Sequence, residues 1–274
     1  REAKFNHTPL VSVLVPCYET KPVFLEDLIL SLQDQTYDNF ELVLADASKT
    51  ANVRRLAESY MEQYGNIVYY HLDSNDGISE NTNKGLELCQ GEYIGLLDHD
   101  DLLTKDALYP VVKAINDAKA KSIDPLLVYT DEDKTDTYLE RYYEPNFKMK
   151  LNEDLIMTNN YICHFSVYKS ELIKELKLRK EYDGAQDFDL VLRTIAYAKS
   201  DSGADGSANS KKWSERIIHV PKVLYHWRCH NESTASNPAS KNYAYESGGR
   251  AIEDYVASQG WRAEIVPLKH LGFY

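Results

Sequence analysis

The first half of the chain alternates short apolar runs with stretches in which apolar residues recur at helical spacing. Runs rich in Val, Ile and Leu predict strands over residues 10–15, 40–45, 67–71, 92–97 and 126–130. Apolar residues spaced for one helix face predict helices between them, over 23–32, 53–64, 79–88 and 104–119. Strands that are apolar throughout and alternate with helices are typical of a parallel sheet covered on both faces. The pattern therefore predicts an α/β fold.

The second half of the chain is less regular. The remaining patterns predict an extended segment over 161–167, helices over 169–177, 187–198 and 243–258, and strands over 217–220, 223–227 and 261–266. The small, polar stretch 199–212 predicts a mobile loop rather than a linker, because apolar strands resume directly after it. We therefore expect a single domain over residues 1–274.

Three aspartates follow the fourth predicted strand, in the order Asp98-His99-Asp100-Asp101. Carboxylates held close together repel one another. A divalent cation relieves that repulsion, and carboxylate oxygens suit hard ions such as Mg²⁺ and Mn²⁺. The motif predicts a metal site, with His99 pointing away from it. The alternative is a solvated turn before the helix that begins near Thr104.

Acidic residues also follow the first two predicted strands, at Glu19 and Asp46. The carboxyl ends of parallel strands meet at one edge of a sheet, where ligands of open α/β folds bind. We therefore expect Glu19, Asp46, Asp98 and Asp100 to line one crevice. Each of them alone could instead cap a helix, and capping is the preferred interpretation of Asp46 taken by itself.

Composition and missing motifs exclude several classes of function. The net charge of −12 argues against a nucleic-acid surface. The widely spaced cysteines form no CxxC pair and predict buried free thiols of a reducing compartment rather than a zinc site; they are Cys17, Cys89, Cys163 and Cys229. With no apolar run of about 18 residues and no signal-peptide pattern, we expect a cytoplasmic protein, which could reach the inner membrane face through partners. Neither GxGxxG nor GxxxxGK[ST] occurs, which argues against a glycine-loop nucleotide site.

A series of motifs runs in one order along residues 10–270. In the first half these are Val11-Ser-Val-Leu-Val-Pro-Cys-Tyr-Glu19, Leu44-Ala-Asp-Ala-Ser48, Asn75-Asp-Gly-Ile-Ser79 with Asn83, and Leu97-Asp-His-Asp-Asp-Leu102. In the second half they are Tyr129-Thr-Asp-Glu-Asp-Lys134, Gly184-Ala-Gln-Asp-Phe-Asp-Leu190 and His219-Val-Pro-Lys-Val-Leu-Tyr-His-Trp-Arg228. Together they resemble family-2 inverting glycosyltransferases of the GT-A fold, in a bacterial branch that acts on surface polysaccharides and glycoproteins.

The resemblance implies a metal-dependent, inverting transfer from a UDP-sugar or dTDP-sugar to a hydroxyl group, with Mn²⁺ or Mg²⁺ as cofactor. The implied acceptor is a glycan, a lipid-linked saccharide or a glycoprotein. A mostly parallel GT-A sheet is implied, with a nucleotide-binding half over about 9–130 and an acceptor and catalytic half over about 131–274. Relatives in this branch often carry a second transferase domain, so we expect the chain to be one module of a longer protein.

Matching positions carry implied roles from the family. Asp187 matches the catalytic base, although it could merely charge a helix N-terminus. Asp100 matches a metal ligand, and His226 matches the late histidine that completes the metal shell. The implied nucleotide-sugar contacts are Pro16, Tyr18, Glu19, Asp46, Gly77, Ile78, Asn83, Asp98, Glu132 and Arg228. His164, Asn160 and Trp227 are expected on the acceptor side.

Several alternatives stay open at this point. Ala47 and Thr82 depart from the family pattern, which leaves the choice of UDP or dTDP undecided, and Gln186 removes a second carboxylate beside the base. His226 could be a hydrogen-bonded core histidine, and Glu132 could lie in a solvated turn. Two other functions compete: a sugar-1-phosphate nucleotidylyltransferase, and a non-catalytic module that binds a nucleotide or a glycan.

Overall fold

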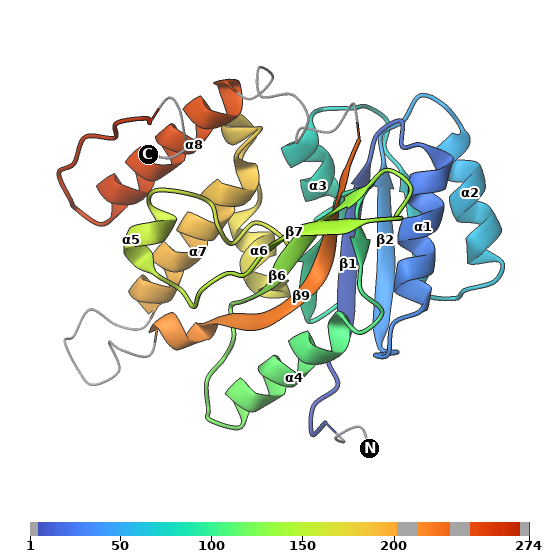
Figure 1. Cartoon of the computed structure of the whole chain (residues 1–274), viewed down its shortest axis with the longest axis horizontal. Helices are drawn as coiled ribbons and strands as arrows, with labels where there is room; N and C mark the ends of the chain where they lie inside the picture. Colours follow the sequence, from blue (N-terminus) through green and yellow to red (C-terminus); the bar gives the residue numbers. More distant parts are fainter. Residues whose placement is uncertain (1–4, 202–212, 231–241, 269–273) are drawn as a thin grey trace.

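The computed structural model describes residues 5–201, 213–230, 242–268 and 274. Figure 1 shows a central sheet with helices packed around it. Within the described residues, nine strands form one sheet in the order β3-β2-β1-β4-β8-β6-β9-β5, and β7 is added on β6. The α/β fold class predicted from the sequence is confirmed.

The first half of the chain forms the regular part of this sheet. Four parallel strands lie side by side, namely β1 (Val11–Cys17), β2 (Phe40–Asp46), β3 (Ile67–His71) and β4 (Tyr93–Leu96). The helices between them are α1 (Pro22–Gln33), α2 (Asn52–Met61) and α3 (Ile78–Leu86). β1 and β2 are buried along their whole length, as expected for strands covered on both faces.

The second half makes the sheet mixed rather than mostly parallel. β8 (Ser166–Lys169) lies between β4 and β6 (Leu127–Asp136) and is antiparallel to both. β9 (Ile217–Cys229) pairs with β6 in parallel, so its carboxyl end points to the same edge as that of β4. Two short strands complete the sheet: β5 (Leu102–Leu103), antiparallel to β9, and β7 (Tyr142–Asn146), antiparallel to β6.

Two apolar cores cover the two faces of the sheet. Val13 of β1 belongs to a core with α1, α2 and α4 (Leu108–Lys119), whereas its neighbour Leu14 belongs to a core with α3 and the helices of the second half. Those helices are α6 (Ser170–Leu176), α7 (Gln186–Asp201) and α8 (Asn242–Ser258), with the short α5 (Glu153–Ile156) and the 3₁₀ turn η1 (Lys180–Tyr182) beside them. The alternation follows the period of two of a strand.

Four expectations differ from the structure. The strand predicted over 261–266 is wrong, because these residues form no strand and are mostly exposed. The strands predicted over 217–220 and 223–227 are one continuous strand, β9. β6 continues to Asp136 because β9 pairs with it throughout, so Glu132 lies in a strand and not in a solvated turn. The helix predicted from Thr104 begins at Leu108, because β5 and a turn take the residues before it. Most of the predicted loop 199–212 lies outside the described residues.

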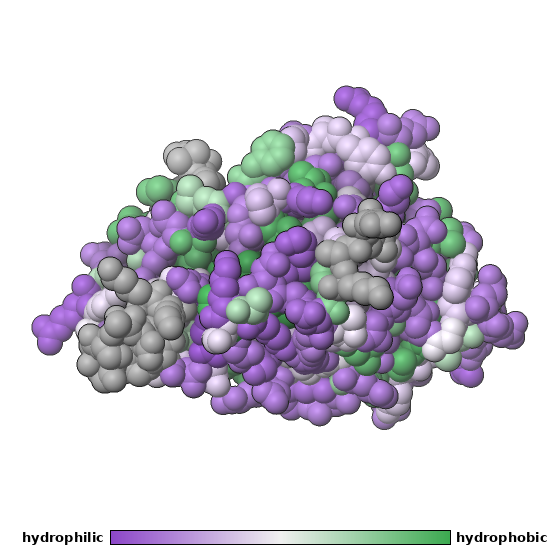
Figure 2. Space-filling view, turned by 90° about the horizontal axis from the view of Figure 1, so that it is seen from below, coloured by the Kyte–Doolittle hydropathy of each residue, from purple (hydrophilic) through white to green (hydrophobic). Residues whose placement is uncertain are grey.

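The surface is largely polar. Figure 2 shows hydrophilic side chains over most of the face seen from below, in keeping with the net charge of −12. None of the helices in the described ranges combines the length and the apolar content needed to cross a bilayer.

Candidate active site

A cleft of about 670 Å³ lies at the carboxyl ends of β1 and β4. The starts of α7 and α8 and the segment around His164 close its other sides. The structure brings together here the predicted residues Pro16, Tyr18, Glu19, Ile78, Asp98, Asp100, His164, Asp187 and Trp227. These residues come from both halves of the chain, so the cleft lies where the two predicted halves meet.

Two of the three aspartates after β4 face the cleft. The side chain of Asp98 is 56% exposed there, and Asp100 lines the same wall. Asp101 turns into the core, where it accepts hydrogen bonds from the Tyr225 hydroxyl and the Arg228 backbone N–H, and burial raises its pKa well above the usual value. The expectation that His99 points away from the cleft is wrong, because it lines the cleft. The motif therefore divides into two cleft carboxylates and one structural carboxylate.

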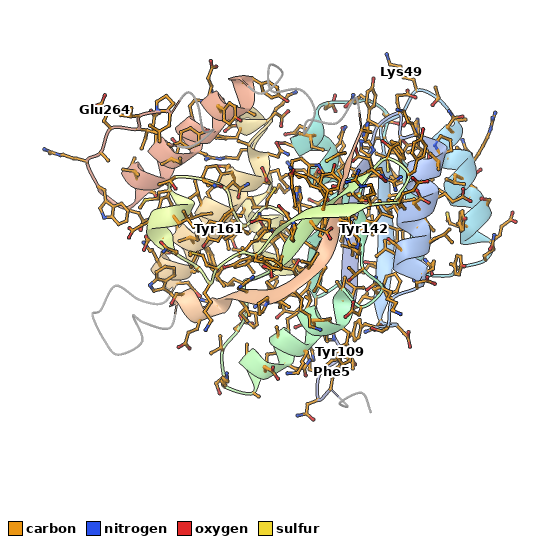
Figure 3. All side chains as sticks on the ribbon, viewed as in Figure 1. Phe5, Lys49, Tyr109, Tyr142, Tyr161 and Glu264 are labelled. Atoms are coloured by element: carbon orange, nitrogen blue, oxygen red, sulfur yellow. The ribbon has the colours of Figure 1, made fainter. Side chains whose placement is uncertain are left out.

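The histidine beside Asp100 is His230 and not His226. Its Nε2 lies 2.8 Å from Asp100 Oδ2. His226 instead lies within β9, where its Nδ1 is 2.5 Å from Asp133 Oδ1 and its ring packs on Tyr142 of β7. Tyr142 is labelled on β7 in Figure 3. Sequence reasoning missed His230, which directly follows the carboxyl end of β9.

The chemistry of Asp100 and His230 fits a hard divalent cation that takes most of its ligands from a substrate. Within the described ranges, no three or more acidic, histidine or cysteine side chains form a group able to hold a metal by themselves. Mg²⁺ is commonly held by one or two carboxylates together with substrate phosphates and water. A cation at this position would therefore need the diphosphate of a nucleotide to complete its shell.

A buried charge network lies behind the cleft wall. Lys148, whose side chain is fully buried, donates to Glu132 (3.2 Å), to the Ile162 carbonyl (2.7 Å) and to the carbonyl of His164. Nδ1 of His164 lies 3.1 Å from Glu132 Oε2, and its Nε2 lies 3.7 Å from Asp98 Oδ2. Glu132 thus supports His164 from behind and does not itself line the cleft.

Glu132 and His164 shift each other's pKa. Burial would raise the pKa of Glu132, but His164 and Lys148 together lower it to about 2. Burial would lower the pKa of His164, yet its electrostatic interactions and hydrogen bonds with Cys163 and Glu132 raise it well above the usual value. His164 is therefore an imidazolium at neutral pH, a cation on the wall of the cleft that also carries Asp98, Asp100 and Asp187.

Asp187 faces the cleft from the first turn of α7. Asn160 Nδ2 donates to its Oδ2 at 2.7 Å. Asp189, two residues later, is buried and forms ion pairs with Arg179 and Arg193, so its carboxylate is structural. The structure therefore leaves Asp187 as the carboxylate that α7 presents to the cleft.

Glu19 and Asp46 organise the loops that follow β1 and β2. Glu19 lines the cleft, and its carboxylate accepts from the Thr50 hydroxyl (2.6 Å) and the Lys49 N–H (2.8 Å), which lowers its pKa. Asp46 is fully buried outside the cleft lining and accepts from the Tyr69 hydroxyl and the Ser48 N–H, both at 2.9 Å. Asp46 is thus a buried structural carboxylate, and the expectation that it caps a helix is wrong, because Ala51 holds the N-cap position of α2 without a side-chain cap.

Gly77 and Asn83 also lie behind the lining rather than in it. Gly77 has φ 102°, and a Cβ there would meet Asp183 Oδ2 at 2.8 Å, so both the backbone and the space favour glycine. The Asn83 side chain donates to the Leu178 carbonyl and accepts from the Leu178 N–H, each at 2.8 Å. Both residues place Ile78 and α3 against the cleft.

Arg228 is not brought to the cleft. Its guanidinium is buried, donates to Asp27 Oδ2 from two nitrogens at 2.9 Å each, and lies 4.5 Å from the centre of the Phe24 ring. The long strand β9 turns this side chain into the core beside α1. A contact with the nucleotide sugar was expected, and the structure gives Arg228 a core position instead.

Replacing Arg228 with methionine is expected to lower the free energy of unfolding by about 3 kcal/mol, because Asp27 loses its partner in a largely buried setting. Urea denaturation measures the change, with Arg262→Met on the exposed surface as a control of equal chemistry. UDP affinity, measured by calorimetry, should not change. A large loss of UDP affinity at unchanged stability would return Arg228 to the donor site.

The chain is similar to known proteins over most of its length. Residues 12–177 match the family described as Glycosyl transferase family 2. The chain is 36% identical over 98% of its length to protein y4gI of Sinorhizobium fredii, and 30% identical over 96% of its length to the O-antigen biosynthesis protein RfbC of Myxococcus xanthus. It spans only 28% and 19% of the lengths of these two relatives.

A solved structure shares the fold. The crystal structure of S. aureus TarS in complex with UDP-GlcNAc matches with a TM-score of 0.65 at 20% identity, over 90% of this chain and 66% of the TarS chain. The sheet and its flanking helices are those of the GT-A fold. The family match covers more than half of the chain and includes the strand-end motifs of the cleft. The chain therefore belongs to glycosyl transferase family 2.

Proposed function

We propose that the cleft binds a nucleotide diphosphate sugar together with a divalent cation and transfers the sugar, with inversion, to a hydroxyl group of a glycan. The single observation that supports this most is that Asp98 and Asp100 share one cleft with Asp187. A leaving diphosphate needs positive charge near it, and an attacking hydroxyl needs a base. One cleft that holds residues for both tasks suits a single displacement at the anomeric carbon.

The cation would be held by Asp100 and His230. When bound, it would act as a Lewis acid that offsets the charge of the diphosphate. Pro16, Tyr18 and Ile78 would form the wall on the nucleotide side. Either Mn²⁺ or Mg²⁺ suits these ligands, since both accept carboxylate oxygen and imidazole is tolerated by the former.

Asp187 would act as the general base. Its carboxylate takes the proton of the acceptor hydroxyl while the acceptor oxygen forms a bond to the anomeric carbon. The bond from that carbon to the diphosphate oxygen breaks, and its electron pair leaves with the nucleoside diphosphate. The imidazolium of His164, next to Asp98, adds positive charge to the cleft as the leaving group becomes more negative. No covalent enzyme intermediate is required.

A panel of nucleotide sugars tests the proposal. UDP-, dTDP- and GDP-sugars are incubated with the protein in Mn²⁺, in Mg²⁺ or in EDTA, and released nucleoside diphosphate is measured with and without added glycan acceptors. We expect release from at least one donor with metal, and faster release with the correct acceptor. If no donor binds or reacts under any condition, the proposal is wrong.

A further inference from the structure

Two donors from one short segment converge on a single oxygen of Asp187. Asn160 Nδ2 lies 2.7 Å from Oδ2, and Cys163 Sγ lies 3.4 Å from the same atom. Among the residues that the structure describes, no group donates to Oδ1. The two oxygens of this carboxylate are therefore unequal: one is held and the other is left to face a reactant.

The donor segment is itself fixed from several sides. Asn160 Oδ1 accepts from the Cys163 backbone N–H at 3.4 Å, and the Tyr161 hydroxyl accepts from the Asn152 N–H at 2.8 Å. The Lys148 ammonium donates to the backbone carbonyls of Ile162 and His164. Figure 3 labels Tyr161 between α5 and α7, the helix that carries Asp187. The donors are thus set in place before any substrate arrives, which limits the cost of orienting the base.

The protonation states fix the direction of these hydrogen bonds. Burial raises the pKa of the Cys163 thiol to about 12, so the thiol keeps its proton. Nδ1 of His164 lies 3.1 Å from Glu132 Oε2, and its Nε2 lies 3.3 Å from Cys163 Sγ. Because the ionised carboxylate of Asp187 can only accept, the protonated thiol of Cys163 is the donor in its 3.4 Å contact with Asp187 Oδ2. Asn160 and Cys163 therefore both donate to this oxygen.

We infer that Asn160 and Cys163 are positioning residues for the transfer reaction, which hold Oδ2 of Asp187 so that Oδ1 receives the proton of the attacking hydroxyl. This inference rests on the function proposed above. In a structural role, the same contacts would only secure the start of α7 against the sheet. The two roles differ in what they change, since orientation of the base affects turnover, whereas packing affects stability.

The test compares turnover, donor binding and melting temperature in matched variants. Turnover is nucleoside diphosphate release by hydrolysis of the donor found most active in the panel, so that water replaces the acceptor. Binding of the matching nucleoside diphosphate is measured by calorimetry. We expect Asn160→Ala to reduce kcat about 10²-fold, because a misplaced base costs rates of this order. Affinity and melting temperature should stay near those of Asn159→Ala, an adjacent asparagine that does not contact Asp187.

Variants of Cys163 test the inference independently if Asn160→Ala does not fold. Cys163→Ala should lower kcat, and Cys163→Ser should restore most of it, because the hydroxyl can donate to the same oxygen. A double-mutant cycle tests whether Asn160 acts through Asp187. In the Asp187→Asn background, Asn160→Ala should cause little further loss, since both act through one carboxylate.

The outcomes separate the inference from the proposed function. If the wild type turns over and Asn160→Ala and Cys163→Ala behave like Asn159→Ala, the inference is overturned and the function stands. Additive losses in the double variant would also overturn it, because Asn160 would then act independently of Asp187. If the wild type turns over no donor, the proposed function fails and the inference fails with it.

Discussion

Replacing Asp187 with asparagine is expected to reduce sugar transfer about 10²–10⁴-fold, the usual contribution of a positioned general base. Asparagine keeps the size and shape of the side chain but cannot take a proton from the acceptor. The residue lies on α7, opposite the sheet edge that carries Asp98 and Asp100, so donor binding should be preserved. The effect should therefore appear in kcat and not in the dissociation constant of the nucleotide.

Steady-state turnover and calorimetry on the same preparation check this prediction. Asp154→Asn, an exposed aspartate of α5, is the matched control and should leave both quantities unchanged. Turnover of the Asp187 variant within a factor of a few of the wild type would remove Asp187 from its role. A large loss of nucleotide affinity would instead place it in the donor site.

Removal of the divalent cation is expected to lower turnover about 10²–10³-fold, because a Lewis acid at the leaving diphosphate supplies several kcal/mol and each 1.4 kcal/mol is worth tenfold. Asp100→Asn should have a similar effect in the presence of metal, since the amide loses the charge that attracts the cation. Turnover after dialysis against EDTA, followed by addition of Mn²⁺ or Mg²⁺, measures both. Full activity in EDTA would contradict the prediction.

The two histidines near the end of β9 provide an internal control for this site. His230→Ala should weaken Mn²⁺ binding in the presence of UDP, observed by the electron paramagnetic resonance of free Mn²⁺. His226→Ala should not, because His226 is held by Asp133 and Tyr142. A larger effect at His226 would mean that the sequence motif, and not the contact with Asp100, identifies the ligand.

The first half of the fold was predictable because its strands are continuous apolar runs with a helix between each pair. β3 over Ile67–His71 agrees with the prediction to the residue. The second half was harder, since β8 is a short strand whose partners lie far away in sequence, and β7 is mostly exposed and so has no apolar run. The apolar residues over 261–266 predicted a strand, but no partner strand lies beside them in the described structure.

Ser79 shows how a tertiary contact overrides a local signal. A serine before an apolar helical run is a good N-cap, and the expected helix begins there. In the structure Gly77 holds the cap position, and the Ser79 hydroxyl donates to Asp183 at 2.5 Å instead. The partner comes from more than a hundred residues away, so no local rule could find it.

The site residues were predictable where they follow parallel strands and were missed where tertiary packing brings them together. The strand-end rule correctly brought Asp98 and Asp100 to one cleft, because it depends only on parallel strands sharing an edge. The same rule would also have found His230 if the strand predicted over 223–227 had been extended to Cys229, where β9 ends. Lys148 was missed, because it lies on a loop that only tertiary packing brings near Glu132. Asn160 was expected on the acceptor side, but not as a partner of Asp187. Family membership favours the transferase over the nucleotidylyltransferase, and the panel of nucleotide sugars tests transfer against binding alone.

The central claim is most directly tested by crystals soaked with Mn²⁺ and UDP, measured at a wavelength that gives anomalous scattering from manganese. The account predicts an anomalous peak bound by Asp100 and His230, with the diphosphate of UDP in contact with it and the cleft open toward Asp187. Nucleotide and manganese both absent from this sheet edge, or bound together elsewhere on the molecule, would contradict it.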